Sequence, residues 1–328
     1  MDWTKQCLYF IAGMFVLFFT VSCTGLRAPQ GTAKAGPQTL SVEQDGSLLA
    51  KYAPVFILDE ADKNYNRIGT PAVRDNGAGD LEIYIDTLTP TIYSLEQTFK
   101  TERGEYTNLI YRVHFERTPF RHLTGGRNVG LLMIVTLDQK GLPLLITTVH
   151  TCGCYLAFIP TSNLPANRYP ESWSVSPQDV YGERLPGLIS LEDSKNSGYR
   201  FALRIKSGTH RIAGLSLLSE DDILLRSNVM TAALQPMKAL RELPFGKAEV
   251  SFFETEGARK GYVRNSQKPL ERLLMSWWLL DWRVGEDKDL GPKELTGTVF
   301  YTSLKPWARG KSDLWDFENF LQYWGWKF

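Results

Sequence analysis

The segment His150-Thr151-Cys152-Gly153-Cys154 brings an imidazole and two thiols close together in the sequence. On an extended strand, residues 150, 152 and 154 point to the same face, which places these three groups in one row. Imidazole and thiolate are natural ligands of zinc and copper. Same-face neighbours on a straight strand lie ~6.6 Å apart. We therefore expect His150, Cys152 and Cys154 to share one ion only if Gly153 bends the chain.

Two other interpretations of the cysteine pair remain open. In an oxidising compartment, Cys152 and Cys154 can close a disulfide, either structural or redox-active. A protonated His150 beside them would favour the thiolate and hence thiol exchange. Alternatively, both thiols are buried in the core as small apolar groups. The pattern does not choose among a metal site, a disulfide and buried thiols.

Two further histidines and an arginine are candidate ligand-binding residues. His114 lies on the polar face of a predicted strand, which is either solvated or lines a groove. His122 and Arg127 lie in the segment 117–127, which holds three arginines. Such a segment can receive an anionic ligand, although solvation is the simpler interpretation.

The C-terminal region is rich in tryptophan. Seven of the nine tryptophans lie between Trp277 and Trp326. Tryptophan can stack on sugars, and it also anchors proteins at bilayer interfaces. The helical spacing of several of these residues favours core packing. Trp307 and Trp326 fit a core least well, and they are candidate carbohydrate-binding residues.

The acidic run Glu286-Asp287-Lys288-Asp289 lacks the ligand spacing of a calcium loop, so we expect a solvated turn. The sequence also lacks the usual signatures of phosphate-binding loops, dinucleotide sites, serine hydrolases, zinc proteases and haem attachment. Whether the chain is an enzyme therefore stays uncertain. A binding or assembly role is the leading expectation.

The first 22 residues predict a secretory signal peptide. Its apolar core, Leu8 to Phe19, is about a dozen residues long, whereas a membrane span needs about 20. Small residues then precede Cys23. Residues 23–47 are rich in Gly, Ala, Pro, Thr, Gln and Ser, which predicts a flexible tether.

The segment Thr20-Val21-Ser22-Cys23 resembles the lipobox of bacterial lipoproteins. Val21, Ser22 and Cys23 fit its pattern, and Thr20 stands where an aliphatic residue is usual. The resemblance implies cleavage before Cys23 and attachment of lipid to its thiol. It also implies a place in the bacterial cell envelope, with the membrane as a partner. Thr24 is not the Asp that resembles an inner-membrane retention signal, so the outer membrane is favoured.

The elements that position these residues begin with strands. Alternating apolar residues predict strands over 81–87 and 109–117. A continuous apolar run over 129–137 predicts a strand buried on both faces. Asp138 to Gly141 predicts a turn into the next run, 144–159, and so a hairpin. Further strands are expected over 201–206 and 248–253.

Helices are expected later in the chain. Ser219 to Asp222 resembles a capping box that opens a helix running towards Pro236. Pro269 predicts the first turn of a helix that runs through Leu279. Ser312 and Asp313 predict the cap of a last helix. Strands first and helices later indicate an α+β fold with a mainly antiparallel sheet or sandwich.

The segments 49–54 and 109–150, together with Tyr65, are similar to vacuolar-sorting-associated β-sandwich proteins. Those proteins carry a central His…Asp-Trp-Glu segment, where this chain has Arg127-Asn128-Val129-Gly130. The resemblance therefore implies a sandwich fold and no functional residue. Residues 48–328 are expected to form one domain, with a candidate internal boundary in the Pro-rich stretch 160–187.

Composition sets the outer limits. The 328 residues carry 37 Lys and Arg against 36 Asp and Glu, a net charge of +1, which disfavours nucleic acid as a partner. Four cysteines exclude a disulfide-dense scaffold. We therefore expect an envelope lipoprotein that binds an envelope protein or glycan. A protein dependent on zinc, copper or thiols is the alternative.

Overall fold

The computed structural model describes residues 37–192 and 198–328. The predicted signal peptide, Cys23 and the first part of the predicted tether lie outside the described residues. The described residues belong to one compact unit, and the Pro-rich stretch 160–187 lies inside it.

The larger sheet has eight strands, and its centre is a run of antiparallel neighbours. The run consists of β5 (Thr91–Thr101), β6 (Gly104–Thr118), β7 (Gly126–Leu137), β8 (Pro143–His150) and β9 (Ala157–Pro160). The predicted hairpin between β7 and β8 is confirmed, including its turn. Gly141 adopts a left-handed φ of 74° there, and its N–H donates to Asp138 O over 2.9 Å. Three further strands complete this sheet: β3 (Ile68–Asp75), β4 (Leu81–Asp86) and β15 (Ala233–Pro236).

A second sheet packs on one face of the first. Its five strands have the order β13 (Ile212–Ser219), β12 (Tyr199–Ile205), β2 (Val55–Leu58), β1 (Gln38–Ser41), β14 (Val229–Thr231). One apolar core joins Phe56 and Leu203 of this sheet to Tyr111 and Met133 of the larger sheet. Two small hairpins lie outside both sheets, β10 (Gln178–Val180) with β11 (Glu183–Leu185), and β16 (Leu243–Phe245) with β17 (Ala248–Val250).

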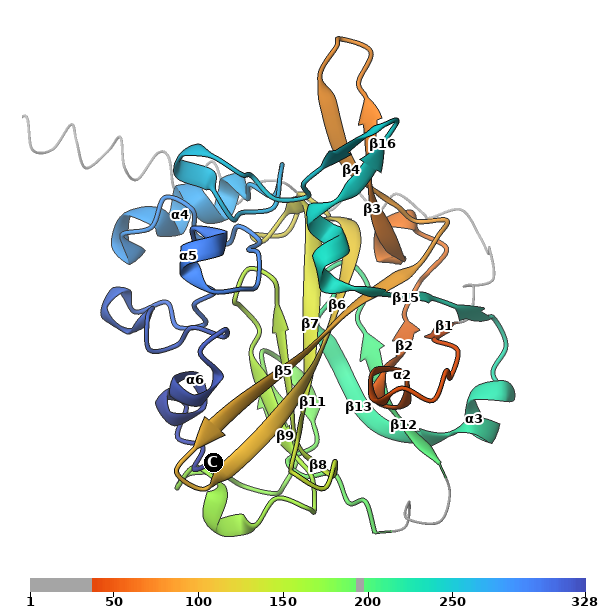
Figure 1. Ribbon diagram of the computed structural model, residues 1–328, viewed down its shortest axis with the longest axis vertical. Helices are drawn as coiled ribbons and strands as arrows, with labels where there is room; N and C mark the ends of the chain where they lie inside the picture. The colour runs from red at the N-terminus through yellow and green to blue at the C-terminus, as the bar shows by residue number, and fades with distance from the viewer. Residues whose placement is uncertain (1–36, 193–197) are drawn as a thin grey trace, which may run out of the picture. The chain divides into compact units, whose positions relative to one another are not determined.

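The C-terminal part of the chain covers the other face of the larger sheet. Figure 1 shows α4 (Pro269–Leu279), α5 (Lys293–Thr296) and α6 (Phe317–Tyr323) along one side of β5–β9, with β12, β13 and α2 (Leu48–Tyr52) on the other side. Successive residues of β7 therefore enter two different cores. Met133 packs in the sandwich core, whereas Leu132 and Ile134 pack against C-terminal residues such as Phe300. This explains the continuous apolar run of β7, as predicted.

The C-terminal part of the chain also covers the polar face of β6, which was expected to be solvated or to line a groove. His114, expected on that face, is 0% exposed, and so is Arg112 on the same face of the strand. Their neighbour Ile110 belongs to the core formed with the C-terminal segment. The alternation in β6 thus separates two buried faces.

The helices match the predictions only in part. The helix from Pro269 to Leu279 is confirmed as α4. The capping box at Ser219 is present, but its helix, α3 (Glu220–Leu224), ends long before Pro236 because β14 and β15 follow. The last helix, α6, begins at Phe317, and Ser312 does not cap it. Five short 3₁₀ helices complete the described elements: η1 (Asn64–Asn66), η2 (Ala166–Arg168), η3 (Met237–Arg241), η4 (Gly257–Arg259) and η5 (Pro306–Ala308).

The predicted tether does not extend to residue 47. Residues 38–41 form β1, which pairs with β2 and β14, instead of extending the tether to residue 47. Leu40 is 1% exposed and Val42 is 5% exposed. These two apolar side chains pack in the sandwich core. The average composition of residues 23–47 does not show them, because most of the other residues in that range are small or polar. The fold is α+β, mainly antiparallel and sandwich-like, with most helical residues in the C-terminal half.

Replacing Leu40 by Ala tests whether β1 belongs to the folded unit. Because the side chain is enclosed, we expect Leu40→Ala to lower the free energy of unfolding by about 2–5 kcal/mol. Urea unfolding of the purified protein measures this change. Leu88→Ala is the control, since Leu88 is 76% exposed and such a change stays within about 0.5 kcal/mol. Equal effects of the two substitutions would show that residues 38–41 do not pack in the core.

Candidate functional site

The chain turns sharply after His150 instead of continuing as the extended strand expected over 144–159. The N–H of His150 donates to Cys154 O over 2.9 Å, and the N–H of Gly153 donates to His150 O over 2.7 Å. Gly153 has a φ of 90°, and a Cβ there would lie 2.1 Å from Tyr301 O. Glycine is required both for the left-handed backbone and for this close approach. We call residues 150–155 the cysteine turn.

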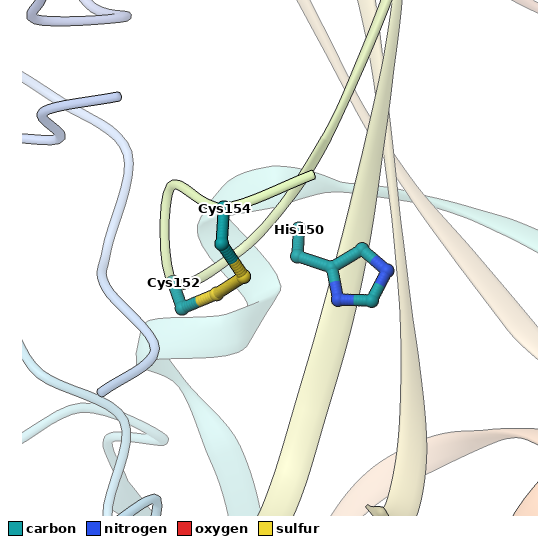
Figure 2. A group of neighbouring side chains, drawn as sticks. All are labelled: His150, Cys152 and Cys154. Atoms are coloured by element: carbon teal, nitrogen blue, oxygen red, sulfur yellow. A yellow bond between two sulfur atoms is a disulfide. The ribbon is translucent and has the colours of Figure 1, made fainter. Parts of the chain in front are cut away.

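The turn brings the three predicted ligands together. Figure 2 shows Cys152 and Cys154 joined by a disulfide, with the His150 imidazole beside it. The Cα atoms of the two cysteines are 5.6 Å apart, within the usual range for a disulfide. One nitrogen of His150 and the two sulfurs all lie within 4.8 Å of one another. In the disulfide form both thiolates are consumed, so metal binding by all three residues requires reduction of the bond.

His150 faces the second sheet. Its Nε2 lies 3.0 Å from the backbone oxygen of His210, and the Nε2 of His210 lies 2.8 Å from Tyr65 O. The His210 ring also stacks on Phe115, with ring centroids 4.0 Å apart. As neutral imidazoles, both residues donate an N–H to these carbonyls. The two histidines therefore connect the cysteine turn to the loop between β12 and β13.

Burial keeps both imidazoles neutral. Burial, together with the positive charge of Lys268, lowers the pKa of His150 to about 3. Burial likewise lowers the pKa of His210 to about 4. Thiol exchange assisted by a protonated His150 is thus disfavoured at neutral pH, because the imidazole is neutral there.

The acidic run expected to be a solvated turn is buried. Glu286, Asp287, Lys288 and Asp289 are each at most 4% exposed. We call residues 286–289 the ionic segment. Its side-chain charges belong to the interior, where each must find a partner. Sequence reasoning missed this segment because four consecutive charged residues are typical of a solvated surface.

The ionic segment holds the cysteine turn from the C-terminal side. The ammonium of Lys288 donates to Cys152 O over 2.6 Å and to Glu286 O over 3.1 Å, and it lies 4.2 Å from the Tyr301 ring centre. The backbone N–H of Lys288 also donates to Thr151 O over 2.9 Å. The Thr151 hydroxyl donates to the carboxylate of Asp287. Burial lowers the pKa of Lys288 to about 8, while nearby carboxylates oppose that effect.

Each acid of the ionic segment has a cationic partner. The pairs are Glu286 with Arg259, Asp287 with Lys268 at 3.6 Å, and Asp289 with Arg241 at 2.8 Å. Burial still raises the pKa of the Glu286 and Asp289 carboxyls, since it disfavours their charged forms. The arrangement is a buried ion-pair network that joins the C-terminal segment to the cysteine turn.

His114 lies deeper in the same layer. Its Nε2 accepts a hydrogen bond of 2.9 Å from Arg112 Nε, and its ring packs edge-on against Phe252, with centroids 4.6 Å apart. Burial lowers the pKa of His114 well below its usual value, and the Arg112 charge acts in the same direction. The side chain is enclosed, so the expectation that it lines a solvent-facing groove is wrong.

The remaining candidates divide by exposure. His122 and Arg127 are exposed, and Arg127 forms an ion pair of 3.3 Å with Glu82, which also pairs with Arg74. Trp326 is 3% exposed and packs against Trp173, which excludes it as a sugar-stacking surface. Trp307 is 80% exposed, and carbohydrate binding through it stays a prediction.

Comparisons with known proteins give no identity. No protein-family model, curated protein or solved structure matches this chain.

The depressed pKa of His150 predicts acid sensitivity. Below pH 6.5 the unfolded chain binds a proton at His150, whereas the folded chain does so only near pH 3. Stability from this group is therefore lost as the pH falls through that window. Between pH 6.5 and 4.5, we expect the wild type to lose about 2 kcal/mol more than His150→Gln.

Urea unfolding at a series of pH values measures this difference. The exposed His122 supplies the control, and His122→Gln should follow the wild-type pH profile. The difference between profiles is informative even if His150→Gln is less stable at every pH. Parallel profiles for wild type and His150→Gln would contradict the buried, neutral imidazole.

Proposed function

We propose that this chain is an exported protein of a bacterial envelope, anchored by lipid at Cys23, whose folded body acts by binding or assembly. The observation that carries the proposal is the bond between Cys152 and Cys154. Disulfides persist in oxidising compartments such as the periplasm and cell surface. This agrees with the apolar run of residues 8–19 and the lipobox-like segment that ends at Cys23.

The surroundings of the bond support a structural role over thiol catalysis. Cys152 is 4% exposed, and its carbonyl is held by the Lys288 ammonium. His150 is neutral at physiological pH and is engaged with the backbone of His210. A reactive cysteine needs exposure and a positive environment that favours the thiolate. This bond is enclosed, so the body is proposed to work through its surface.

Lipid attachment is tested by replacing Cys23 with Ala. We expect Cys23→Ala to abolish labelling by a palmitate analogue and to reduce the share of the protein in the membrane fraction, since one acyl chain contributes about 0.8 kcal/mol per buried CH₂. Cys7→Ala is the matched control, because Cys7 lies within the predicted signal peptide and should not affect labelling. Unchanged labelling of Cys23→Ala would refute the anchor.

A metal-dependent function is the second candidate, and the closeness of His150, Cys152 and Cys154 favours it. Zinc or copper would be held by the two thiolates and one imidazole nitrogen once the disulfide is reduced. A fourth ligand would have to come from water or a partner.

Metal analysis with thiol titration separates the two candidates. We expect the protein purified without reductant to hold no stoichiometric zinc or copper, and Cys152 and Cys154 to react with a thiol reagent only after reduction. Cys152→Ser tests the site, with His122→Gln as the control. Stoichiometric metal in the wild type that is lost in Cys152→Ser alone would instead establish the metal function.

A further inference from the structure

Helix α4 exposes an unusual apolar face. On its solvent side, the leucines and tryptophans lie at i, i+3 and i+4 spacing, and so share one face. Their exposed fractions are 45% for Leu270, 72% for Leu273, 57% for Leu274, 70% for Trp277 and 53% for Trp278. Leu280 and Trp282, just after the helix, are 74% and 67% exposed. We call these seven residues together with Trp307 the α4 face.

The opposite side of the same helix is fixed in the protein. Glu271, Ser276 and Leu279 are each at most 6% exposed. Burial raises the pKa of Glu271, whose carboxylate lies against Gly285 at the start of the ionic segment. The helix is therefore attached by Glu271, Ser276 and Leu279, whereas most of its large apolar residues point to solvent. This reverses the usual arrangement of a surface helix.

Trp307 belongs to the same region as the end of α4. It lies in η5, and the next charged residue, Arg309, donates to Leu279 O over 2.6 Å. Arg309 also lies 3.8 Å from the carboxylate of Asp281. These contacts place η5, which carries the exposed Trp307, beside the C-terminal end of the helix. Figure 1 shows α4 on the side of the molecule formed by the C-terminal segment.

Exposed cations lie beside the α4 face. The stretch 304–311 contains Lys305 and Lys311, which are both exposed, and no acidic residue, whereas Arg309 in the same stretch is paired with Asp281. Arg272 lies 5.7 Å from the Trp282 ring centre. Cations beside exposed leucine and tryptophan complement a bilayer with anionic headgroups, where each cation contributes about 1 kcal/mol.

We infer that the α4 face docks into the interface of an anionic lipid bilayer. The helix has 11 residues, so it is about 16 Å long, about half of the ~30 Å hydrocarbon core. Among the described residues, no helix is long and apolar enough to cross a membrane. Leucine and tryptophan on one face suit a helix that lies in the plane of the interface, with the indoles at headgroup level.

The choice of a bilayer as partner rests on the proposed envelope location. A lipid at Cys23 would keep the body next to a membrane. Fourteen residues lie between Cys23 and Gln38 in β1, and an extended chain of that length reaches about 50 Å. Such a reach allows the α4 face to contact the bilayer that holds the anchor. The anchor would then raise the effective concentration of the α4 face at that surface.

Quenching by brominated lipid tests the docking. The mature protein as isolated from cells is reconstituted with phosphatidylglycerol vesicles that carry bromine on the acyl chains. Four of the eight tryptophans in the described residues, Trp277, Trp278, Trp282 and Trp307, are more than half exposed. We expect a blue shift and a loss of roughly half of the tryptophan emission, because interfacial indoles contact the brominated chains.

The variant Leu273→Gln/Leu274→Gln removes apolar area from the α4 face and retains all tryptophans. Both side chains are exposed and glutamine favours helices, so the fold should persist, as near-ultraviolet circular dichroism can show. When both leucines are replaced in the Cys23→Ala protein, we expect at least tenfold weaker binding to the vesicles than Cys23→Ala alone shows. We also expect most of the tryptophan quenching to be lost. Leu224→Gln/Leu225→Gln on α3 is the matched control, since these leucines are 78% and 85% exposed.

The outcomes distinguish this inference from the proposed anchor. Lipid found on Cys23 without quenching of the tryptophans would overturn the docking and leave the anchor intact. Quenching by vesicles in a protein without lipid on Cys23 would support docking alone. Equal quenching in both leucine variants, or a concentration-dependent dimer that buries Trp277 without lipid, would also overturn the docking.

Discussion

The burial of both faces of β6 and β7 is the constraint on which the rest of this structure depends. One face packs on the second sheet and the other on the C-terminal segment. Any polar group on the second face must therefore find its partner inside the protein. Arg112 does so only in part: its Nε bonds to His114, while its two terminal nitrogens have no hydrogen-bond partner among the described residues. Burial lowers the pKa of Arg112 to about 10, which reflects the free energy needed to keep this charge in the core.

The same constraint explains the ionic segment. Buried ion pairs gain little over an apolar replacement, because desolvation offsets most of their attraction. In this protein the ion pairs serve to position the cysteine turn. Lys288 and Asp287 contact the two residues that follow β8, Cys152 and Thr151, and so fix where the turn sits on the sheet. The disulfide closes the turn locally, and His150 ties it to the other layer through His210. Three kinds of interaction thus converge on a turn of a few residues.

Sequence reasoning predicted what local pattern determines and missed what tertiary cover determines. The turn at Gly141, the capping box at Ser219 and the helix opened by Pro269 follow from backbone preferences, and all three are present. The burial of His114 could not be predicted in that way. A strand has the same alternating sequence pattern whether its polar face contacts solvent or a second layer of the protein. Only the fold of residues 237–328 determines which of the two the polar face of β6 contacts. The ionic segment was missed for the same reason, although its apolar flanks, Val284 and Leu290, were a usable signal.

The exposed tryptophans of α4 contradict the expectation that the C-terminal tryptophans pack in the core. Their exposure follows from what lies under the helix. The helical spacing of several C-terminal tryptophans favours core packing, yet Trp277 and Trp278 are exposed. Spacing shows only that residues share a face, not which way the face points. In α4 the inward side is occupied by Glu271 and Ser276, beside the ionic segment. Leu279 is the one leucine of α4 that is buried with them. Because much of that interior is polar, the other leucines and the tryptophans of the helix lie outside. The buried charges and the exposed apolar face are therefore two consequences of one packing arrangement, and a substitution that made the interior apolar would remove the reason for α4 to face outward.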